Sequence, residues 1–248
     1  MPDEVLSADI LDAREGVRHA FFTKAWGGAG AGFADHGMLQ DALLVRARMA
    51  GHLRVAPERF LFCRQIHSSN VVTVGDVWTA HDSPKADAMV TDQSGIALGV
   101  LTADCVPVLL ASLEMPVIGA AHAGWRGALC GVLEHTVEAM EKLGASRQSL
   151  CAALGPCIGQ KSYEVGPEFP APFLAENPLH DKFFKPAFKS DHYLFDLSGY
   201  VAEKLRGLGV ASVAMTPADT CAEPDRFFSY RYSTLRTEER LVSAIALA

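Results

Sequence analysis

The sequence lacks the features that would send a chain out of the cell or into a membrane. Its first twenty residues are acidic and contain no apolar run like that of a secretory signal peptide. The longest apolar stretch, residues 95–112, is interrupted by Asp104 and Pro107, so it predicts two buried strands and not a membrane span. We therefore expect a cytoplasmic protein with no membrane partner.

An excess of positive charge is also missing. The 248 residues include 22 lysines and arginines against 29 aspartates and glutamates, which gives a formal net charge of −7 at pH 7. Such a chain is not expected to bind nucleic acid, although a local basic pocket for an anionic small molecule stays open. With 49% hydrophobic and 21% charged residues, the composition is typical of a globular protein.

Two common cysteine and histidine patterns are absent. None of the six cysteines forms a CxxC pair, which excludes a zinc ribbon and a thioredoxin-type motif. The nine histidines include no HxH sequence, so the paired ligands of a multicopper oxidase are missing. With no export signal, the thiols should be reduced. We expect four of them to be buried: Cys63, Cys130, Cys151 and Cys157.

The residue pattern mixes strands and helices without a steady alternation. Apolar alternation predicts strands within residues 16–24, 60–74, 86–112, 116–122, 149–159, 211–219 and 239–248. Helical spacing is found over residues 40–53, 128–144 and 196–209, the first with an apolar side that consists of Leu43, Leu44, Ala47, Ala50 and Gly51. Residues 170–192 look irregular. Some consecutive strands have no crossover helix between them, and no repeat or linker is found. This favours one α+β domain over residues 1–248, an α/β sandwich with a mixed sheet.

Three metal-binding side chains fall at the predicted ends of separate strands. His67 lies where a strand breaks, Cys105 follows a strand in the sequence TADC, and His122 ends a strand in AAH. Two imidazoles and one thiolate form the three-ligand set of a catalytic zinc site, with a fourth position open to water or substrate. The same residues also suit metal-free catalysis, with Cys105 as the nucleophile and a histidine as its base.

The sequence HAGWRG, residues 122–127, joins one of these strand ends to a helix. Free backbone N–H groups at a helix start and a nearby guanidinium favour an anion, so we predict that Gly124, Arg126 and Gly127 bind one. Trp125 would form a packing or stacking wall. A plain turn with a solvated arginine is the alternative interpretation of this segment.

Six segments resemble one known family: RQIHSSNVV, ADAMVTDQSG, TADCVPVLL, AAHAGWRG, LGPCIGQKSYEVG and FFSYR. This is the multicopper polyphenol oxidoreductase "laccase-domain" family, whose members are also described as purine nucleoside phosphorylases and as peptidoglycan editing factors. The resemblance runs from about His19 to the C-terminus. It implies a mixed α/β fold, similar to that of bacterial toxin deamidases that use Cys and His. It also implies zinc, or alternatively copper, on His67, Cys105 and His122.

Outside this centre the family pattern is only partly present. The glycine-rich loop at residues 25–39 lacks the Ser-Leu-Asn of the family, and an expected Asn-Arg pair is Val45-Arg46, which leaves Arg46 as its substrate-binding residue. The SYRR pattern of the family reads SYRY in this sequence, which keeps Arg231. The Thr-Gly-Arg of the family is replaced by Thr-Glu-Glu-Arg at residues 237–240. These differences bear on substrate preference more than on the metal centre.

The residues and the resemblance together predict an enzyme for small molecules. The first hypothesis is a zinc-dependent purine nucleoside phosphorylase for adenosine, inosine, guanosine and methylthioadenosine, with Arg126 at the phosphate. Adenosine deaminase activity would accompany it, and Asp104 and Glu164 are candidate proton carriers. The alternative is a cytoplasmic amidase that edits a nucleotide-sugar precursor of peptidoglycan, a UDP-MurNAc-amino acid. Copper polyphenol oxidation and a pure binding module rank lower. We expect a monomer.

Overall fold

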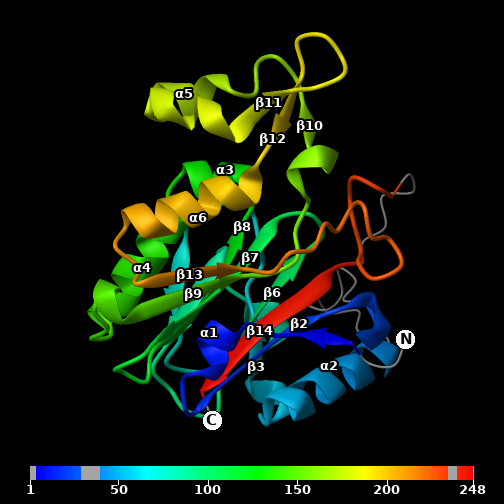
Figure 1. Ribbon diagram of the computed structural model, residues 1–248. Helices are drawn as coiled ribbons and strands as arrows, with labels where there is room; N and C mark the ends of the chain where they lie inside the picture. The colour runs from blue at the N-terminus through cyan, green and yellow to red at the C-terminus, as the bar shows by residue number, and fades with distance from the viewer. Residues whose placement is uncertain (1–3, 29–39, 234–238, 248) are drawn as a thin grey trace.

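The computed structural model describes residues 4–28, 40–233 and 239–247. Two large β-sheets pack face to face, helices cover their outer sides, and a small third sheet projects at one end (Figure 1). The expected α/β sandwich with mixed sheets is confirmed. Most of the glycine-rich loop and the first half of the Thr-Glu-Glu-Arg segment lie outside the described residues. Within the described residues, no helix is long and apolar enough to cross a bilayer.

The first large sheet has five strands, and its centre is the C-terminal strand. Across the sheet the order is β1 (Val5–Leu6), β2 (Val17–Phe22), β14 (Leu241–Leu247), β6 (Ala97–Thr102) and β3 (Phe60–Phe62). Strand β14 pairs antiparallel with both β2 and β6, whereas β3 runs parallel to β6. The chain therefore completes this sheet only when its last strand is inserted.

The second large sheet has six strands. Across it the order is β13 (Ser212–Met215), β9 (Leu150–Leu154), β7 (Val106–Ser112), β8 (Ile118–Ala123), β5 (Ala88–Thr91) and β4 (Val71–Thr73). The two outer pairs, β13 with β9 and β4 with β5, are parallel, and the inner pairs are antiparallel. Both large sheets are thus mixed, as expected from strands that follow one another without a helix.

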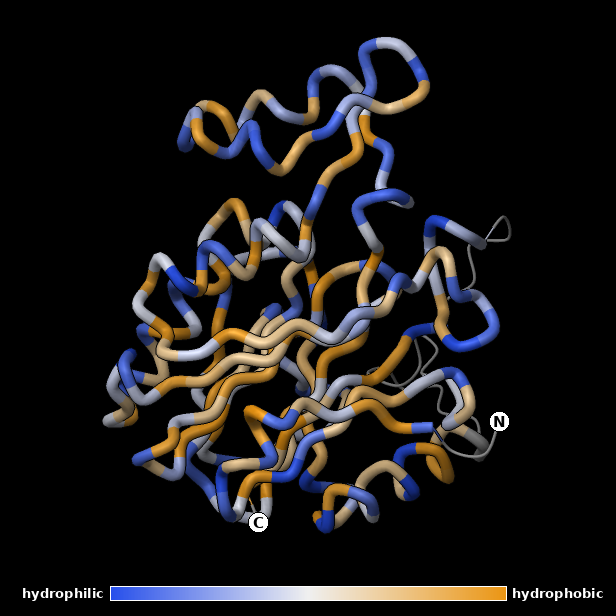
Figure 2. The backbone as a smooth tube through the Cα atoms, viewed as in Figure 1, coloured by the Kyte–Doolittle hydropathy of each residue, from blue (hydrophilic) through white to orange (hydrophobic). Residues whose placement is uncertain are grey.

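The central strands of the two large sheets are largely apolar because both of their faces are covered. Side chains alternate along a strand, so Phe21 packs between the sheets while Phe22 packs toward α2 (Gln40–Leu53). In β7, Leu109 lies between the sheets and Leu110 faces the helices α4 (Val132–Lys142) and α6 (Leu197–Gly207). Figure 2 shows these strands as the most hydrophobic part of the chain. The result is four layers: helix, sheet, sheet, helix.

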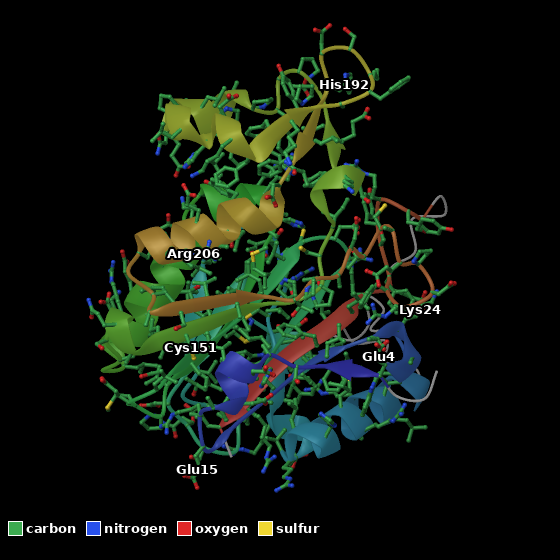
Figure 3. The ribbon with its side chains drawn as sticks, in the orientation of Figure 1. Glu4, Glu15, Lys24, Cys151, His192 and Arg206 are labelled. Carbon is green, nitrogen blue, oxygen red and sulfur yellow. The ribbon has the colours of Figure 1, made fainter. Side chains whose placement is uncertain are left out.

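The segment expected to be irregular, residues 170–192, contains regular structure, so that prediction was wrong. It includes α5 (Ala171–Glu176) and β11 (Phe184–Pro186), and β11 joins β10 (Glu164–Val165) and β12 (Tyr193–Phe195) in a three-stranded sheet. Packing of aromatic rings holds this module together, with Phe173 and Phe195 centroids 4.9 Å apart and Phe184 and Phe195 stacked at 4.8 Å. His192 lies at its outer end, whereas Cys151 lies on β9 in the main body (Figure 3).

The helix predicted over residues 128–144 is interrupted. It forms two helices, α3 (Trp125–Leu129) and α4, because Gly131 between them takes a φ of +96°, which is open to glycine at little cost. Gly144, with a φ of +95°, follows the end of α4 as predicted. The interruption turns Cys130 outward, so the expectation that it is buried was wrong, while Cys63, Cys151 and Cys157 are buried.

Helix α2 spans the predicted residues, but of the predicted apolar side it buries Ala50 and leaves the two leucines exposed. Leu43 and Leu44 are 50% and 63% exposed, whereas Met49, Ala50 and Leu53 are fully buried against the five-stranded sheet. Two overlapping apolar stripes run along this helix, and the sequence alone does not choose between them. The short helix α1 (Asp9–Asp12) precedes β2 and packs on β2 and β9.

Candidate active site

Two of the three predicted metal ligands lie on connections that pass from one large sheet to the other. Cys105 ends the turn between β6 of the five-stranded sheet and β7 of the six-stranded sheet. His67 lies between β3 and β4, which also belong to different sheets. His122 is near the end of β8 and pairs with Pro107 of β7. The site therefore forms where the two sheets join.

The structure brings these three side chains together. The Cys105 Sγ lies 4.0 Å from the His67 Nε2, and the His67 and His122 ring centroids are 4.8 Å apart. All three potential ligand atoms lie within 4.8 Å of one another. Tetrahedral zinc with two nitrogens and one sulfur places ligand atoms ~3.5 Å apart, so only a small contraction is needed. Two imidazoles and a thiolate are donors that zinc accepts, and the residues present fit this metal.

Asp87, which the sequence analysis did not identify, supports two of the three ligands. Its buried carboxylate accepts hydrogen bonds from the backbone N–H groups of Ile66, His67 and Ser68, at 3.2, 2.9 and 2.6 Å, and from the Ser68 hydroxyl. The same carboxylate lies 2.8 Å from the His122 Nδ1. A histidine ligand that donates through one ring nitrogen offers the other to the metal, so Asp87 orients His122.

Two residues of the site have a backbone conformation that is uncommon outside glycine. His67 has a φ of +57° and Asp104 a φ of +92°. Each is fixed by hydrogen bonds nearby: Asp87 accepts from the His67 N–H, and the Asp104 carbonyl accepts from the Ile158 N–H. Backbone strain of this kind persists where the surrounding structure enforces it, and it is common at functional sites.

The electrostatic environment favours ionised side chains at this cluster. Burial opposes ionisation of the Cys105 thiol, but the charge and hydrogen bonds of His122 and His67 outweigh it and lower its pKa to about 6. Burial would also lower the pKa of His122, yet Cys105 and Asp87 raise it to about 9. Hydrogen bonds from His122 and Ser68 overcome burial and lower the pKa of Asp87 to about 2. In the absence of an ion these shifts favour a Cys105 thiolate paired with a protonated His122, and a metal bound here would replace the His122 proton.

Of the two glycines of HAGWRG, Gly124 lies against the candidate ligands Cys105 and His67, and Gly127 lies against the backbone of Ser68, next to His67. A Cβ atom on Gly124 would stand 3.0 Å from both the Cys105 Sγ and the His67 Cδ2, and one on Gly127 would stand 3.0 Å from the Ser68 carbonyl oxygen. Close approach to these residues accounts for both glycines. Helix α3, which begins at Trp125, has only five residues. Anion binding by its backbone stays a prediction.

A pocket of about 830 Å³ opens onto the cluster. Besides the three ligands, its lining includes four arginines: Arg64, Arg126, Arg231 and Arg240. The Arg126 guanidinium lies 4.4 Å from the Trp125 ring, and the Arg231 guanidinium lies 5.1 Å from the Tyr163 ring. In a chain of net charge −7, this concentration of guanidinium groups marks the pocket as a place for anions.

The other predicted site residues have different surroundings. The Asp104 carboxylate lines the pocket but accepts hydrogen bonds from the Thr220 hydroxyl and the Arg231 N–H, both at 2.7 Å. Glu164 is exposed, and its carbonyl oxygen accepts from the Arg231 guanidinium at 2.9 Å. In the described part of the chain, Arg46 is not brought to the pocket. Its guanidinium donates to the carbonyls of Pro57 and Phe60.

The comparisons with known proteins agree with this architecture. The chain belongs to the multi-copper polyphenol oxidoreductase laccase family, whose pattern matches residues 19–248. Purine nucleoside phosphorylase ORF3 of Streptomyces griseus is 37% identical over 246 residues, which cover 94% of this chain and 95% of that relative. Purine nucleoside phosphorylase YfiH of Escherichia coli (strain K12) is 33% identical over 198 residues, or 80% of this chain and 76% of that relative.

Solved structures share the fold. Protein NMB0706 of Neisseria meningitidis superposes with a TM-score of 0.80 and 30% identity, covering 100% of this chain and 99% of its own. The hypothetical protein YfiH of Bacillus licheniformis gives a TM-score of 0.85 at 25% identity, with 100% and 97% coverage. The arrangement of two packed mixed sheets is therefore common to this family.

Sequence reasoning missed two residues of the site, Asp87 and Tyr163. Both lie in segments that carried the family resemblance, ADAMVTDQSG and LGPCIGQKSYEVG, but nothing in either segment assigned a role to them. An aspartate before a strand and a tyrosine beside a turn are ordinary in any globular protein. Only the folded chain places Asp87 under His122 and Tyr163 in the pocket wall.

Proposed function

We propose that the protein is a zinc-dependent purine nucleoside phosphorylase that accepts adenosine, inosine, guanosine and methylthioadenosine and also deaminates adenosine. The observation that carries this proposal is the His67–Cys105–His122 cluster in a pocket that also presents Arg126 and Arg231. Relatives named purine nucleoside phosphorylase that align with nearly all of this chain support it. Its partners would then be small molecules: a nucleoside and phosphate.

Phosphorolysis requires an anion held next to the anomeric carbon of the ribose and a stabilised leaving group. We assign phosphate binding to Arg126 and Arg231, because guanidinium groups match phosphate oxygens in charge and geometry. A zinc ion on His67, Cys105 and His122 would supply a Lewis acid in the same pocket. Trp125, which lines the pocket and packs on Phe169 at 4.9 Å, offers an aromatic wall for the base.

Asp104 was a candidate proton carrier, and its surroundings favour a second role. Its carboxylate accepts from the Thr220 hydroxyl and from the backbone of Arg231, so it ties the segment that bears Arg231 to the turn that bears Cys105. We propose that Asp104 acts mainly by holding these two parts of the pocket together. Glu164 contributes through its carbonyl oxygen, which accepts from the Arg231 guanidinium.

The size of the pocket favours one alternative substrate. A volume of about 830 Å³ is near the upper end of the range usual for small-molecule sites, which is ~300–1,000 Å³. Such a pocket leaves room for a nucleotide-sugar precursor of peptidoglycan, and amide hydrolysis of that precursor is the second candidate. Copper polyphenol oxidation is not proposed, because the described residues contain one three-residue ligand cluster.

The first experiment is product analysis with purified zinc-loaded protein and adenosine, with and without phosphate, beside the Cys105→Ala variant. We expect adenine only when phosphate is present and inosine in either case, and neither product from the variant. If wild type releases neither adenine nor inosine, the phosphorylase proposal is wrong, and UDP-MurNAc-amino acids become the substrates to test.

We also propose that the reaction takes place in the cytoplasm and that the bound metal is zinc, with copper as the alternative. All six cysteines are unpaired thiols, as a reducing compartment would keep them. Metal analysis of protein purified without added metal tests the identity of the ion. A copper content equal to the protein concentration, without zinc, would overturn the assignment.

A further inference from the structure

Tyr163 occupies a place in the pocket wall that the function described above does not use. It follows the short 3-10 turn Gln160–Ser162 and directly precedes β10. Its ring packs on Phe169 and Phe195, with centroid distances of 6.1 and 5.7 Å, so the side chain is anchored in the aromatic core of the small module. The same residue lines the pocket that contains Cys105.

The hydroxyl group of Tyr163 has no hydrogen-bond partner within residues 4–28, 40–233 and 239–247. Tyr200 of the same aromatic core provides the contrast, because its hydroxyl donates to the Glu176 carboxylate at 2.7 Å. The Tyr163 hydroxyl is not among the buried polar atoms that lack a partner, so it is accessible, and a tyrosine anchored by its ring can offer it to a ligand.

Tyr163 lines the same pocket as Cys105, Arg126 and Arg231. Burial and then the Cys105 charge raise the pKa of Tyr163, while the Arg231 and Arg126 charges act in the opposite direction. The phenol therefore stays protonated at physiological pH and can donate a hydrogen bond. The Arg231 guanidinium packs over the Tyr163 ring, 5.1 Å from its centroid. The Tyr163 hydroxyl and this cation are therefore fixed relative to each other.

We propose that the Tyr163 hydroxyl binds the substrate, donating a hydrogen bond to an oxygen of the phosphate that Arg126 and Arg231 hold. This assignment rests on the proposed function. It adds the neutral Tyr163 hydroxyl, as a hydrogen-bond donor, to the two guanidinium groups. A planar guanidinium engages two oxygens of a tetrahedral anion, and a phenol from a separate wall reaches another. The subsite is thus specific for an oxyanion with several oxygens and not for negative charge alone.

The test is direct binding of inorganic phosphate to the zinc-loaded protein by isothermal titration calorimetry, with wild type, Tyr163→Phe and Tyr193→Phe. Tyr163→Phe keeps the ring on Phe169 and beneath Arg231 and removes only the hydroxyl. Tyr193 lies in the same module, packs on Phe184 at 6.3 Å and is not among the residues that line the pocket, so its variant is the matched control.

We expect Tyr163→Phe to weaken phosphate binding about ten-fold or more, the usual effect of losing one hydrogen bond to a charged group, and Tyr193→Phe to bind like wild type. Thermal melting and zinc content should match wild type in both variants. Equal phosphate affinity in Tyr163→Phe and wild type overturns the proposal, and so does the absence of phosphate binding to wild type. If phosphate binds through Tyr163 but no adenine is formed from adenosine, the subsite stands and the phosphorylase function fails.

Discussion

At Asp87, one carboxylate serves both the loop that carries His67 and the imidazole of His122. Its acceptor capacity is fully used by three backbone N–H groups, the Ser68 hydroxyl and the imidazole. A buried carboxylate is stable only when it is so extensively hydrogen-bonded. The charge of Asp87 therefore fixes two metal ligands that come from different segments of the chain.

Asp87→Asn should weaken zinc binding about 10- to 100-fold, because the amide lacks the charge that orients His122 and can no longer accept from every donor. Competition with a chromophoric zinc chelator at neutral pH measures the change. Asp87 precedes strand β5, and the exposed Asp92 follows the same strand. Asp92→Asn is therefore the matched control and should bind zinc like wild type. If Asp87→Asn binds zinc with the affinity of wild type, the Asp87 carboxylate does not orient His67 and His122 for the metal.

The convergence of the three candidate ligands could be predicted from sequence at the residue scale, but their support by Asp87 could not. His67, Cys105 and His122 each combine a metal-binding side chain with a predicted strand end, and the structure places them within 4.8 Å of one another. Asp87 carries no such signal, because its role depends on a distance to His122 across 35 positions. Gly124 was predicted to bind an anion, and the structure adds a close approach of this residue to the Cys105 sulfur that the sequence did not indicate.

Among the elements, strands were easier to predict than their pairing. Periodicity located β2, β7 and β14, but it did not indicate that the turn at residues 103–105 passes from one sheet to the other. Long-range pairing is decided by which apolar faces meet, and a period of two is the same for every strand. The split at Gly131 was hidden because the apolar spacing continues on both sides of it.

The contact between α1 and β2 predicts a dependence of stability on pH. His19 of β2 is buried, and its Nε2 accepts the Ala8 N–H at 2.8 Å at the start of α1. Burial lowers the pKa of His19, although the Asp12 carboxylate, 3.6 Å from its Nδ1, acts in the opposite direction. Below the unfolded-state pKa of ~6.5, the unfolded chain binds a proton that the folded chain does not.

The free energy of unfolding should therefore fall as pH decreases below ~6.5, with His19 contributing at most ~1.4 kcal/mol per pH unit. Urea denaturation at a series of pH values between neutral and mildly acidic measures this slope. His19→Gln should flatten it, and His192→Gln, at a partly exposed residue of the outer loop, should leave it unchanged. An identical slope in wild type and His19→Gln would exclude this histidine as a source.

Over the whole molecule, the metal site is a point at which separate parts of the fold are joined. His67 and Cys105 lie on two of the connections between the large sheets, and His122 lies on β8 inside the six-stranded sheet. The four-layer order was predictable as a sandwich from strands that are apolar on both faces. The joining of the layers at one corner could not be predicted from the sequence, because it depends on three residues that are far apart along the chain.

Zinc bound at this corner should stabilise the folded state as a whole. A ligand that binds only the folded chain adds ~2.7 kcal/mol at a free concentration one hundred times its dissociation constant. For a domain of this size that corresponds to a rise in Tm of ~5–10 °C. Calorimetry of protein treated with a chelator and then reloaded with zinc measures the shift.

Cys105→Ala should lose the shift, because it removes the thiolate that completes the ligand set. Cys130→Ala should keep it, since that thiol is exposed at the end of α3 and lies outside the cluster. The comparison separates binding at the cluster from general effects of zinc on free thiols. An equal rise in Tm in Cys105→Ala and wild type would mean that the stabilising ion binds elsewhere, and the joining of the two sheets would then depend on the protein alone.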